Sequence, residues 1–261
     1  MMGIELEEAR RGQAMRLKRH AVLLGTALVA ISLVGCVQPY PIPSPSPIPT
    51  PTPADDKGGV VFLISDAAAD LSAVSRAELT VNSVQARAQG GAWVALSSTT
   101  QTYDLVKLKV ENSTQLLAEA ALNAGDYDRV KIDVSQIVVV DNNGTNQCTM
   151  PNNTLEMDAN FEIQSGSTAA VELDFILDES LYVASDGRYV FAPTVQLETR
   201  NEADVQIKSD DEVEVSGGQV VTNVKLGMSL EGEMGIGLGI DLGSILNIDS
   251  SGKITIGMGG G

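Results

Sequence analysis

Histidine is almost absent from this sequence. The 261 residues include one histidine, His20, and it lies in an N-terminal segment that we expect to be removed. A mature chain without histidine has no Ser–His–Asp or Cys–His arrangement for nucleophilic catalysis, and it lacks His-containing zinc sites. We therefore expect a protein that is not an enzyme.

Cysteine is also scarce, because the chain has only Cys36 and Cys148. We expect Cys36 to carry lipid, as argued below, which leaves Cys148 without a partner in the same chain. An unpaired cysteine in an exported protein indicates a buried thiol, an intermolecular disulfide or a reactive group. We favour the buried thiol. Without a disulfide framework, the fold has to depend on its hydrophobic core.

Basic residues are too few to balance the acidic ones. Removing residues 1–35 takes away five basic and three acidic residues, which changes the formal net charge from −17 to −19. A field of this sign repels nucleic acid, so we expect no nucleic-acid partner. Cations or a cationic partner match the charge, whereas the simpler alternative is that the charge keeps the protein soluble.

A hydrophobic run long enough to span a membrane is missing as well. The apolar run 21–34 is shorter than the ~20 residues that a transmembrane helix needs. It follows the basic segment 15–20, and this order is typical of a signal peptide. The start of translation is either Met1 or Met15, because the acidic stretch before Met15 is unusual in a signal peptide.

The apolar run ends in Leu33-Val34-Gly35-Cys36, which resembles the bacterial lipobox. We predict cleavage after Gly35 and a lipid on the Cys36 thiol. The membrane would then be a partner through the lipid anchor. The mature protein would be extracytoplasmic, on the cell membrane or on the outer membrane of a cell with two membranes. The alternative is an uncleaved N-terminal anchor.

A proline-rich linker over 36–58 follows the anchor, with proline at every second position from Pro39 to Pro53. Proline fixes φ and removes a backbone donor, so this segment favours polyproline II over helix or strand. At ~3.1 Å per residue it makes a stalk of roughly 45 Å. We predict a spacer, with a ligand for a proline-binding domain as the alternative.

Short β-rich runs separated by turn residues fill the region 59–200. Many short strands at this spacing favour an all-β fold, an antiparallel β-sandwich. The segment 116–122 is the one short helix that we expect. The predicted strands are 59–64, 77–86, 93–96, 103–110, 128–134, 136–140, 159–163, 169–177 and 189–197.

Several short motifs recur here in a fixed order. In sequence they are 65–67 (Ser-Asp-Ala), 93–96, 103–105, 124–132, 161–163, 173–175 and 191–195. Over roughly 58–199 the chain resembles a family of prokaryotic exported lipoproteins, the domain of unknown function 4382 (DUF4382). The resemblance implies a sandwich similar to immunoglobulin-like or prealbumin-like modules, and it implies no activity and no catalytic residues.

Two aromatic residues in these motifs have structural interpretations. We expect Tyr127 to cap the core with its hydroxyl bonded to backbone, as in a tyrosine corner. We expect Trp93 to pack in the core or against a hairpin, with ligand stacking as the alternative.

Carboxylates in turns are the remaining candidates for chemistry. Calcium binds six to eight oxygens, which loop Asp and Asn residues and carbonyls can supply, but no stretch matches an EF-hand loop. Bound calcium is thus an alternative to solvated loop charge. A pair of carboxylates can also hydrolyse glycans, although no spacing identifies such a pair. The candidate metal ligands are Asp66, Asp70, Asp126, Asp128 and Asp141, and Asp178 and Glu179 follow another predicted strand.

The C-terminal tail 201–261 is acidic first and glycine-containing afterwards. From Val220 to Met258 most of the apolar residues lie at even positions, a period of two that predicts strands with one hydrophobic face. Gly235, Gly237 and Gly239 leave the other face bare, so another backbone could approach closely. We predict a meander that covers an open face of the sandwich, with self-association through 216–261 as the alternative.

Our leading hypothesis is a surface lipoprotein whose non-catalytic β-sandwich has a binding or structural role, with an unidentified protein or glycan partner. A calcium- or carbohydrate-binding module is the first alternative. A carboxylate-based glycan hydrolase is the second. We expect no cofactor, calcium excepted.

Overall fold

The fold is given by a computed structural model that describes residues 56–66, 73–208, 211–241 and 243–257. The predicted signal peptide, Cys36 and the proline-rich run Pro39–Pro53 lie outside the described residues. Among the helices that are described, none is long and apolar enough to cross a membrane.

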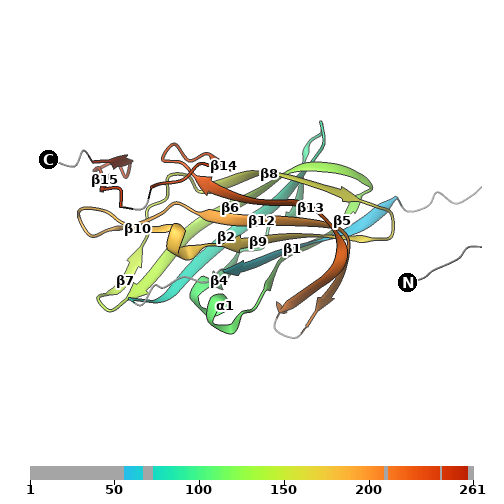
Figure 1. The fold of residues 1–261 in the computed structure, drawn as a ribbon, viewed down its shortest axis with the longest axis horizontal. Coiled ribbons are helices and arrows are strands. Elements are labelled where there is room, and N and C mark those ends of the chain that lie inside the picture. The colour runs from blue at the N-terminus through green and yellow to red at the C-terminus, as the bar shows by residue number, and fades with distance from the viewer. Residues whose placement is uncertain (1–55, 67–72, 209–210, 242, 258–261) are drawn as a thin grey trace, which may run out of the picture. The chain divides into compact units, whose positions relative to one another are not determined.

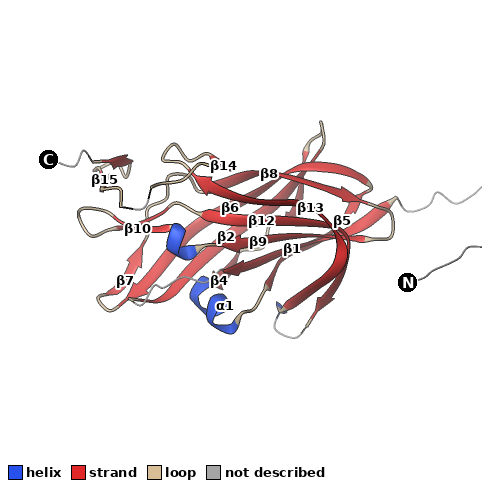
Figure 2. Ribbon diagram, in the orientation of Figure 1, coloured by secondary structure: helices blue, strands red, loops and turns tan. Residues whose placement is uncertain are grey.

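The domain is built from two six-stranded sheets that pack face to face around one core (Figures 1 and 2). Sheet A has the order β14-β13-β12-β9-β1-β5, with bounds Met234–Ile236, Val213–Met228, Thr194–Ile207, Thr168–Phe175, Lys57–Asp66 and Gln115–Asn123. Its strand pairs are antiparallel except β1 and β9, which run parallel.

Sheet B has the order β3-β2-β6-β7, with β4 also pairing with β2 and β8 with β6. The bounds are β3 Trp93–Ser97, β2 Val74–Ala88, β6 Gly125–Asp141, β7 Gly144–Gln147, β4 Gln101–Asp104 and β8 Thr154–Ile163. The smaller elements are α1 Leu105–Glu111, η1 Leu177–Glu179, the pair β10 Leu181–Val183 and β11 Tyr189–Phe191, and the pair β15 Leu246–Ile248 and β16 Ile254–Ile256. The all-β class predicted from the sequence is confirmed.

Strand β1 is buried on both faces, which explains its unbroken apolar run. Phe62 and its even-numbered neighbours face the main core, whereas Val61 and Leu63 belong to a second cluster on the other face. That second cluster includes Ala203 and Val213 from the far end of the β12–β13 hairpin.

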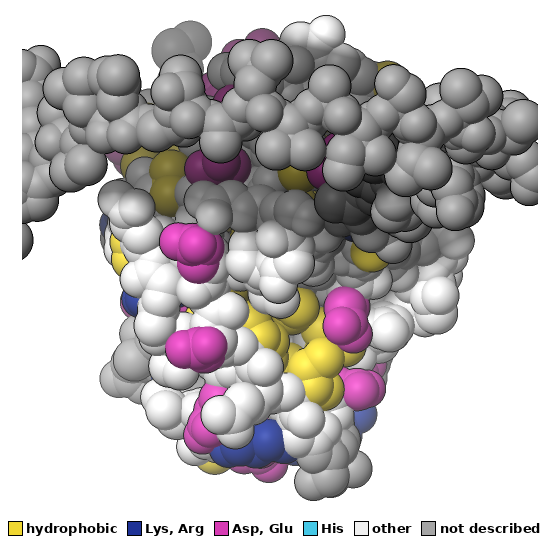
Figure 3. All heavy atoms as spheres, turned by 90° about the vertical axis from the view of Figure 1, so that its right-hand side faces the viewer, with side chains coloured by type: hydrophobic (Ala, Val, Ile, Leu, Met, Phe, Trp, Pro, Cys, Tyr) yellow, Lys and Arg dark blue, Asp and Glu magenta, His cyan; other side chains and the backbone are white. Residues whose placement is uncertain are grey.

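The β12–β13 hairpin bends over the outer face of sheet A and reaches its opposite edge. The Val213 N–H donates to the Thr114 carbonyl at 2.9 Å, and Glu212 bridges to Gln115 at the start of β5. The bend covers Val61 and Leu63, which would otherwise face solvent. Figure 3 views the right-hand end of the domain in Figure 1, where Asp and Glu side chains surround a hydrophobic area.

Helix α1 corrects the strand predicted over 103–110 from Leu105 onward, whereas residues 103 and 104 belong to β4. Alternating lysines suggested a period of two, but Leu105 and Leu108 are the buried pair, three positions apart on one helical face, and Val110 is 77% exposed. The Asp104 side chain caps the helix by accepting from the Lys107 N–H at 3.3 Å, and Asn112 ends it in the left-handed conformation.

Strand β5 corrects the helix predicted over 116–122. Its alanines and leucines favour a helix locally, yet β5 pairs antiparallel with β1 from Lys57↔Asn123 to Ile64↔Gln115. Tertiary pairing therefore overrides the local helix propensity here.

The tail adds strands to the sandwich, as its period of two predicts. β13 joins sheet A beside β12, and β12 itself continues through residue 200. Leu246, Ile248 and Ile254 of the β15–β16 pair belong to the main core. Self-association through 216–261 stays a prediction.

Candidate functional site

The carboxylates singled out in the sequence are spread over the domain. Asp126 and Asp128 lie at the first residues of β6, and Asp141 is its last residue. Asp66 ends β1, whereas Asp70 lies outside the described residues. No three His, Cys, Asp or Glu side chains within the described ranges form a group able to hold a metal ion.

Asp128 is engaged in a bidentate ion pair. Both of its oxygens accept from Arg87, each at 2.9 Å, and this hydrogen bonding lowers the pKa of the carboxyl. Arg87 and Lys131 in turn lie over the ring of Trp93, at 5.7 Å and 4.4 Å from its centre. Trp93 therefore packs at the β2–β3 hairpin, with part of its surface exposed.

Asp141 stabilises a turn. Its Oδ1 accepts from the backbone N–H of Asn143 at 2.7 Å and of Gly144 at 2.9 Å, and its Oδ2 accepts from the Tyr189 hydroxyl at 2.8 Å. The hydroxyl and then the backbone donors lower the pKa of this carboxyl. Gly144 has φ +133, a conformation that glycine adopts without strain, so the side chain and the glycine together set the β6–β7 hairpin.

Asp66 differs from the other candidates because it is buried, with 9% of its surface exposed. Its Oδ1 accepts from the Leu177 N–H at 3.1 Å, which caps the start of η1. Its Oδ2 is buried and has no hydrogen-bond partner among the described residues. Burial, reinforced by the nearby charge of Asp174, raises the pKa of this carboxyl to about 7.

The aromatic and thiol predictions can be checked directly. The Tyr127 hydroxyl donates to the Asn123 carbonyl at 3.1 Å, so the expected backbone bond is present. Cys148 is a free cysteine, 9% exposed, and burial raises the pKa of its thiol to about 12. A thiol that stays protonated at neutral pH is a poor nucleophile, which supports the interpretation of a buried, inert cysteine.

A pocket of about 210 Å³ lies on the outer face of sheet A, beside η1. Sequence reasoning did not identify it. Its polar lining comes from η1 and the residues after it, from β12 and β13, and from the glycine-rich segment 235–241, which we call the strap. The polar side chains are Glu179, Tyr182, Thr194, Lys225 and Asp241.

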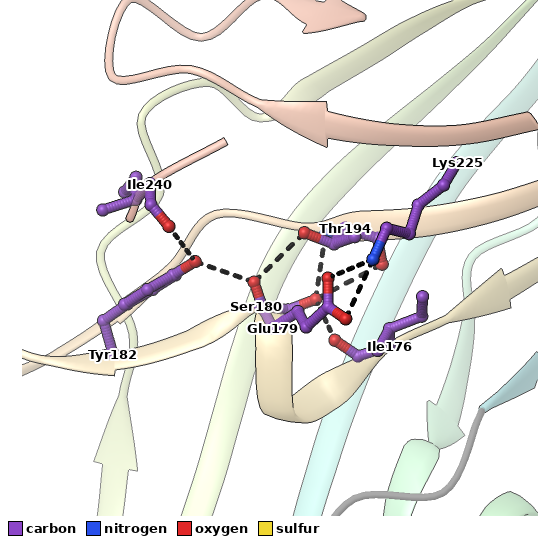
Figure 4. A network of polar contacts seen from close by, with 7 residues as sticks. All are labelled: Ile176, Glu179, Ser180, Tyr182, Thr194, Lys225 and Ile240. Carbon is purple, nitrogen blue, oxygen red and sulfur yellow. Dashed lines mark hydrogen bonds and ion pairs between the residues drawn. The ribbon is translucent and has the colours of Figure 1, made fainter. Parts of the chain in front are cut away.

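An ion pair crosses this pocket. Lys225 Nζ lies 3.0 Å and 2.8 Å from the two carboxylate oxygens of Glu179 (Figure 4). Both side chains are in contact with solvent, with 52% and 36% of their surfaces exposed. An ion pair of this exposure contributes about 0–1 kcal/mol, so a ligand of matching charge can displace it.

Buried hydrogen bonds hold the floor of the pocket in place. The Ser180 hydroxyl, which is fully buried, donates to the Ile176 carbonyl at 2.6 Å and accepts from the Thr194 N–H at 2.9 Å. The Thr194 hydroxyl donates to the Glu179 carbonyl at 3.1 Å. These bonds tie η1 to β12 and fix the backbone on which the charged side chains stand (Figure 4).

The strap forms one wall because it crosses β13 at Gly227. A Cβ built on Gly227 would overlap the Leu238 carbonyl oxygen and lie 2.8 Å from the Leu238 carbonyl carbon. The close backbone approach expected in the tail is therefore made within the chain itself. It occurs at Gly227, whereas the sequence pattern pointed to Gly235, Gly237 and Gly239.

Tyr182 connects the strap to η1. Its hydroxyl lies 2.8 Å from the Glu179 carbonyl oxygen and 2.9 Å from the Ile240 carbonyl oxygen (Figure 4). Burial raises the pKa of this hydroxyl, and the negative charges of Glu179 and Asp241 raise it further. The negative charges of Glu179 and Asp241 therefore both act on the Tyr182 hydroxyl.

Distance along the chain explains why the sequence did not show this site. Lys225 and Glu179 are 46 positions apart, and Tyr182 and Ile240 are 58 positions apart. Only Glu179 had a local signal, as part of an acidic pair after a predicted strand.

A comparison with known protein families matches residues 57–193 to the domain of unknown function (DUF4382). The matched region runs from β1 to β11 and contains η1 and Tyr182, whereas Lys225 and the strap lie beyond it. Searches among curated proteins and among solved structures each returned no match. Because the match covers more than half of the sequence, the chain belongs to the DUF4382 family.

Proposed function

We propose that this protein is an exported lipoprotein whose β-sandwich binds a small polar ligand at the η1 pocket without transforming it. The observation that carries the binding role is the pocket itself. It combines opposite charges with a floor fixed by the buried Ser180, and the described lining contains no paired nucleophile and base. Such a site is suited to recognition by hydrogen bonds and charge.

The lipobox supports the proposed location. Each lipid methylene buried in a bilayer contributes ~0.8 kcal/mol, so two or more acyl chains on Cys36 hold a protein firmly. The proline-rich segment would then keep the domain clear of the membrane surface. Anchoring and binding are independent parts of the proposal and are tested separately.

Replacing the lipidated cysteine is expected to release the protein from the membrane. The wild type should partition into the detergent phase, and mass spectrometry should find an N-terminal peptide that begins at an acylated Cys36. Cys36→Ala removes the thiol that accepts lipid, so this variant should carry no acyl chains and should appear in the aqueous phase.

Cys148→Ala is the matched control, because Cys148 is buried and lies far from the N-terminus in sequence. It should partition as the wild type does. An unmodified peptide that runs intact through residue 36 in the wild type would refute the anchoring part of the proposal.

Glycan binding by the outer face of sheet B is a second candidate, favoured by a row of polar side chains on the same face as Trp93. Asp133 accepts hydrogen bonds from Ser83 at 2.6 Å and from Thr154 at 2.8 Å, which links β2, β6 and β8 in one polar row. A polar row and a partly exposed aromatic ring on one face suit sugar hydroxyls and the apolar face of a sugar ring.

Trp93→Ala is expected to weaken any glycan binding at this face by tenfold or more, since aromatic anchors carry much of the energy of such contacts. A glycan array followed by calorimetry on the hits measures the change. Val94→Ala, one position along the same edge strand, is the control and should bind as the wild type does. Equal binding by Trp93→Ala would remove this candidate.

A further inference from the structure

The η1 pocket has more hydrogen-bond acceptors than donors. The Tyr182 hydroxyl carries one proton, yet it lies within hydrogen-bond distance of two carbonyl oxygens, those of Glu179 and Ile240. The Glu179 carbonyl has a second donor in the Thr194 hydroxyl. When Tyr182 donates to Glu179, the Ile240 carbonyl loses the donor that this hydroxyl supplies.

Negative charges outnumber positive charges in the pocket, just as acceptors outnumber donors. Two carboxylates, Glu179 and Asp241, lie in the lining with one ammonium, Lys225. The full sequence is itself strongly acidic, with 34 acidic against 17 basic residues. The field therefore favours a cation over an anion.

A primary ammonium group matches both features. It has a positive charge and three N–H donors, and it accepts no hydrogen bond. Lys225 already places such a group against Glu179, at 2.8 and 3.0 Å from the two carboxylate oxygens. The protein's own lysine thus shows which chemical group this carboxylate accepts, and its 52% exposure leaves room for it to swing away.

We propose that the η1 pocket binds the ammonium group of a small primary amine, and that Lys225 occupies the amine's place in the free protein. The ligand ammonium would contact the Glu179 and Asp241 carboxylates and donate to the Ile240 carbonyl. A volume of about 210 Å³ admits a compact amine such as a short diamine or an amino sugar. This inference rests on the proposed binding function and specifies its ligand class.

Three four-carbon probes of similar shape separate the alternatives by charge: 1,4-diaminobutane, 1,4-butanediol and succinate. Calorimetry of the full mature chain at low ionic strength should show binding of the diamine alone, weakening as salt is added. Removing the internal competitor with Lys225→Met should strengthen diamine binding, by up to about fivefold for an ion pair of this exposure. Glu179→Gln and Asp241→Asn should each weaken diamine binding by fivefold or more.

The sign of the Lys225→Met effect decides the inference. Weaker diamine binding by this variant would overturn it, as would succinate binding that depends on Lys225, because either result makes Lys225 a ligand contact. Absence of diamine binding to both the wild type and Lys225→Met would also overturn it. Binding of the diol or succinate would still support a binding role, and the Cys36 experiment tests anchoring independently. Circular dichroism checks that the variants remain folded, and Lys225→Gln removes the same charge with a polar side chain.

Discussion

Gly227→Ala should unfold at a markedly lower urea concentration than the wild type and should lose the η1 pocket. The new Cβ would meet the Leu238 carbonyl and lie 3.1 Å from the Gly239 Cα, which are backbone atoms with no rotamer to relieve the overlap. Overpacking of this kind costs about 1–3 kcal/mol, and displacement of the strap adds the loss of its own contacts. Equilibrium denaturation measures the change in unfolding free energy.

The strap gives this substitution a second readout. If the strap is displaced from β13, Ile240 and Asp241 leave the pocket, so the diamine affinity should fall together with stability. Limited proteolysis should also cut the variant within 235–241 at a protease concentration that leaves the wild type intact, because a displaced strap exposes its backbone.

Gly91→Ala is the matched control. Gly91 lies in the exposed turn between β2 and β3, and its Cβ would come no closer than 3.3 Å to Ala88. This contact needs a shift of only a few tenths of an ångström, so stability and diamine affinity should stay near the wild-type values. A Gly227→Ala protein as stable as Gly91→Ala would show that the strap does not lie against β13.

The fold class could be predicted because it depends on local patterns that repeat. The period of two in the tail gave β13 and the buried residues of β15 and β16, and the unbroken apolar run 59–64 gave β1. Such patterns state which side chains must be buried. They do not state which strand lies beside which.

The two errors in secondary structure have this origin. In α1 the sequence alternates apolar and basic residues, so strand and helix both satisfy the pattern, and only the placement of Leu105 and Leu108 in the core decides for the helix. In β5 the residues favour a helix locally, but pairing with the edge of β1 makes the segment a strand. Each outcome depends on a partner distant in sequence or on the core.

The candidate site was less accessible to sequence reasoning than the fold. Asp141 begins a turn, as predicted, whereas Asp126 and Asp128, also predicted on a turn, lie within β6. The partners of Asp128 and Asp141, Arg87 and Tyr189, are 41 and 48 positions away. Because of these partners, Asp128 and Asp141 stabilise the fold and are not free to bind a metal ion. Asp66 was singled out as a calcium ligand, and the structure adds its burial against η1, which no local pattern reports.

The burial of Asp66 predicts a dependence of stability on pH. Its carboxyl has a pKa of about 7 in the folded chain and 3.8 ordinarily. Below about pH 4 it is protonated in both states and costs nothing. Between about pH 4 and 7 the folded state keeps a proton that the unfolded chain has released, so the unfolding free energy falls as pH rises. Above pH 7 the full cost is present, at most about 4 kcal/mol.

Three charged groups surround this carboxyl. Asp174 of β9 and Asp178 of η1 disfavour its ionised form, and Lys109 of α1 favours it. The pKa values of Asp174 and Glu172 are also raised, mainly by burial, so these two groups contribute to the same slope. A variant at position 66 should therefore reduce the pH dependence without abolishing it.

Asp66→Asn is the variant that isolates the contribution of Asp66. The amide oxygen can still accept from the Leu177 N–H, while the buried charge is gone. Urea denaturation at pH 5 and pH 8 should show the variant more stable than the wild type at pH 8, with a smaller difference at pH 5. Asp126→Asn, at the exposed start of β6, is the control and should leave the unfolding free energy unchanged at both pH values. If Asp66→Asn and the wild type lost equal stability between pH 5 and pH 8, the Asp66 carboxyl would be ionised without cost in the folded chain, and this prediction would be wrong.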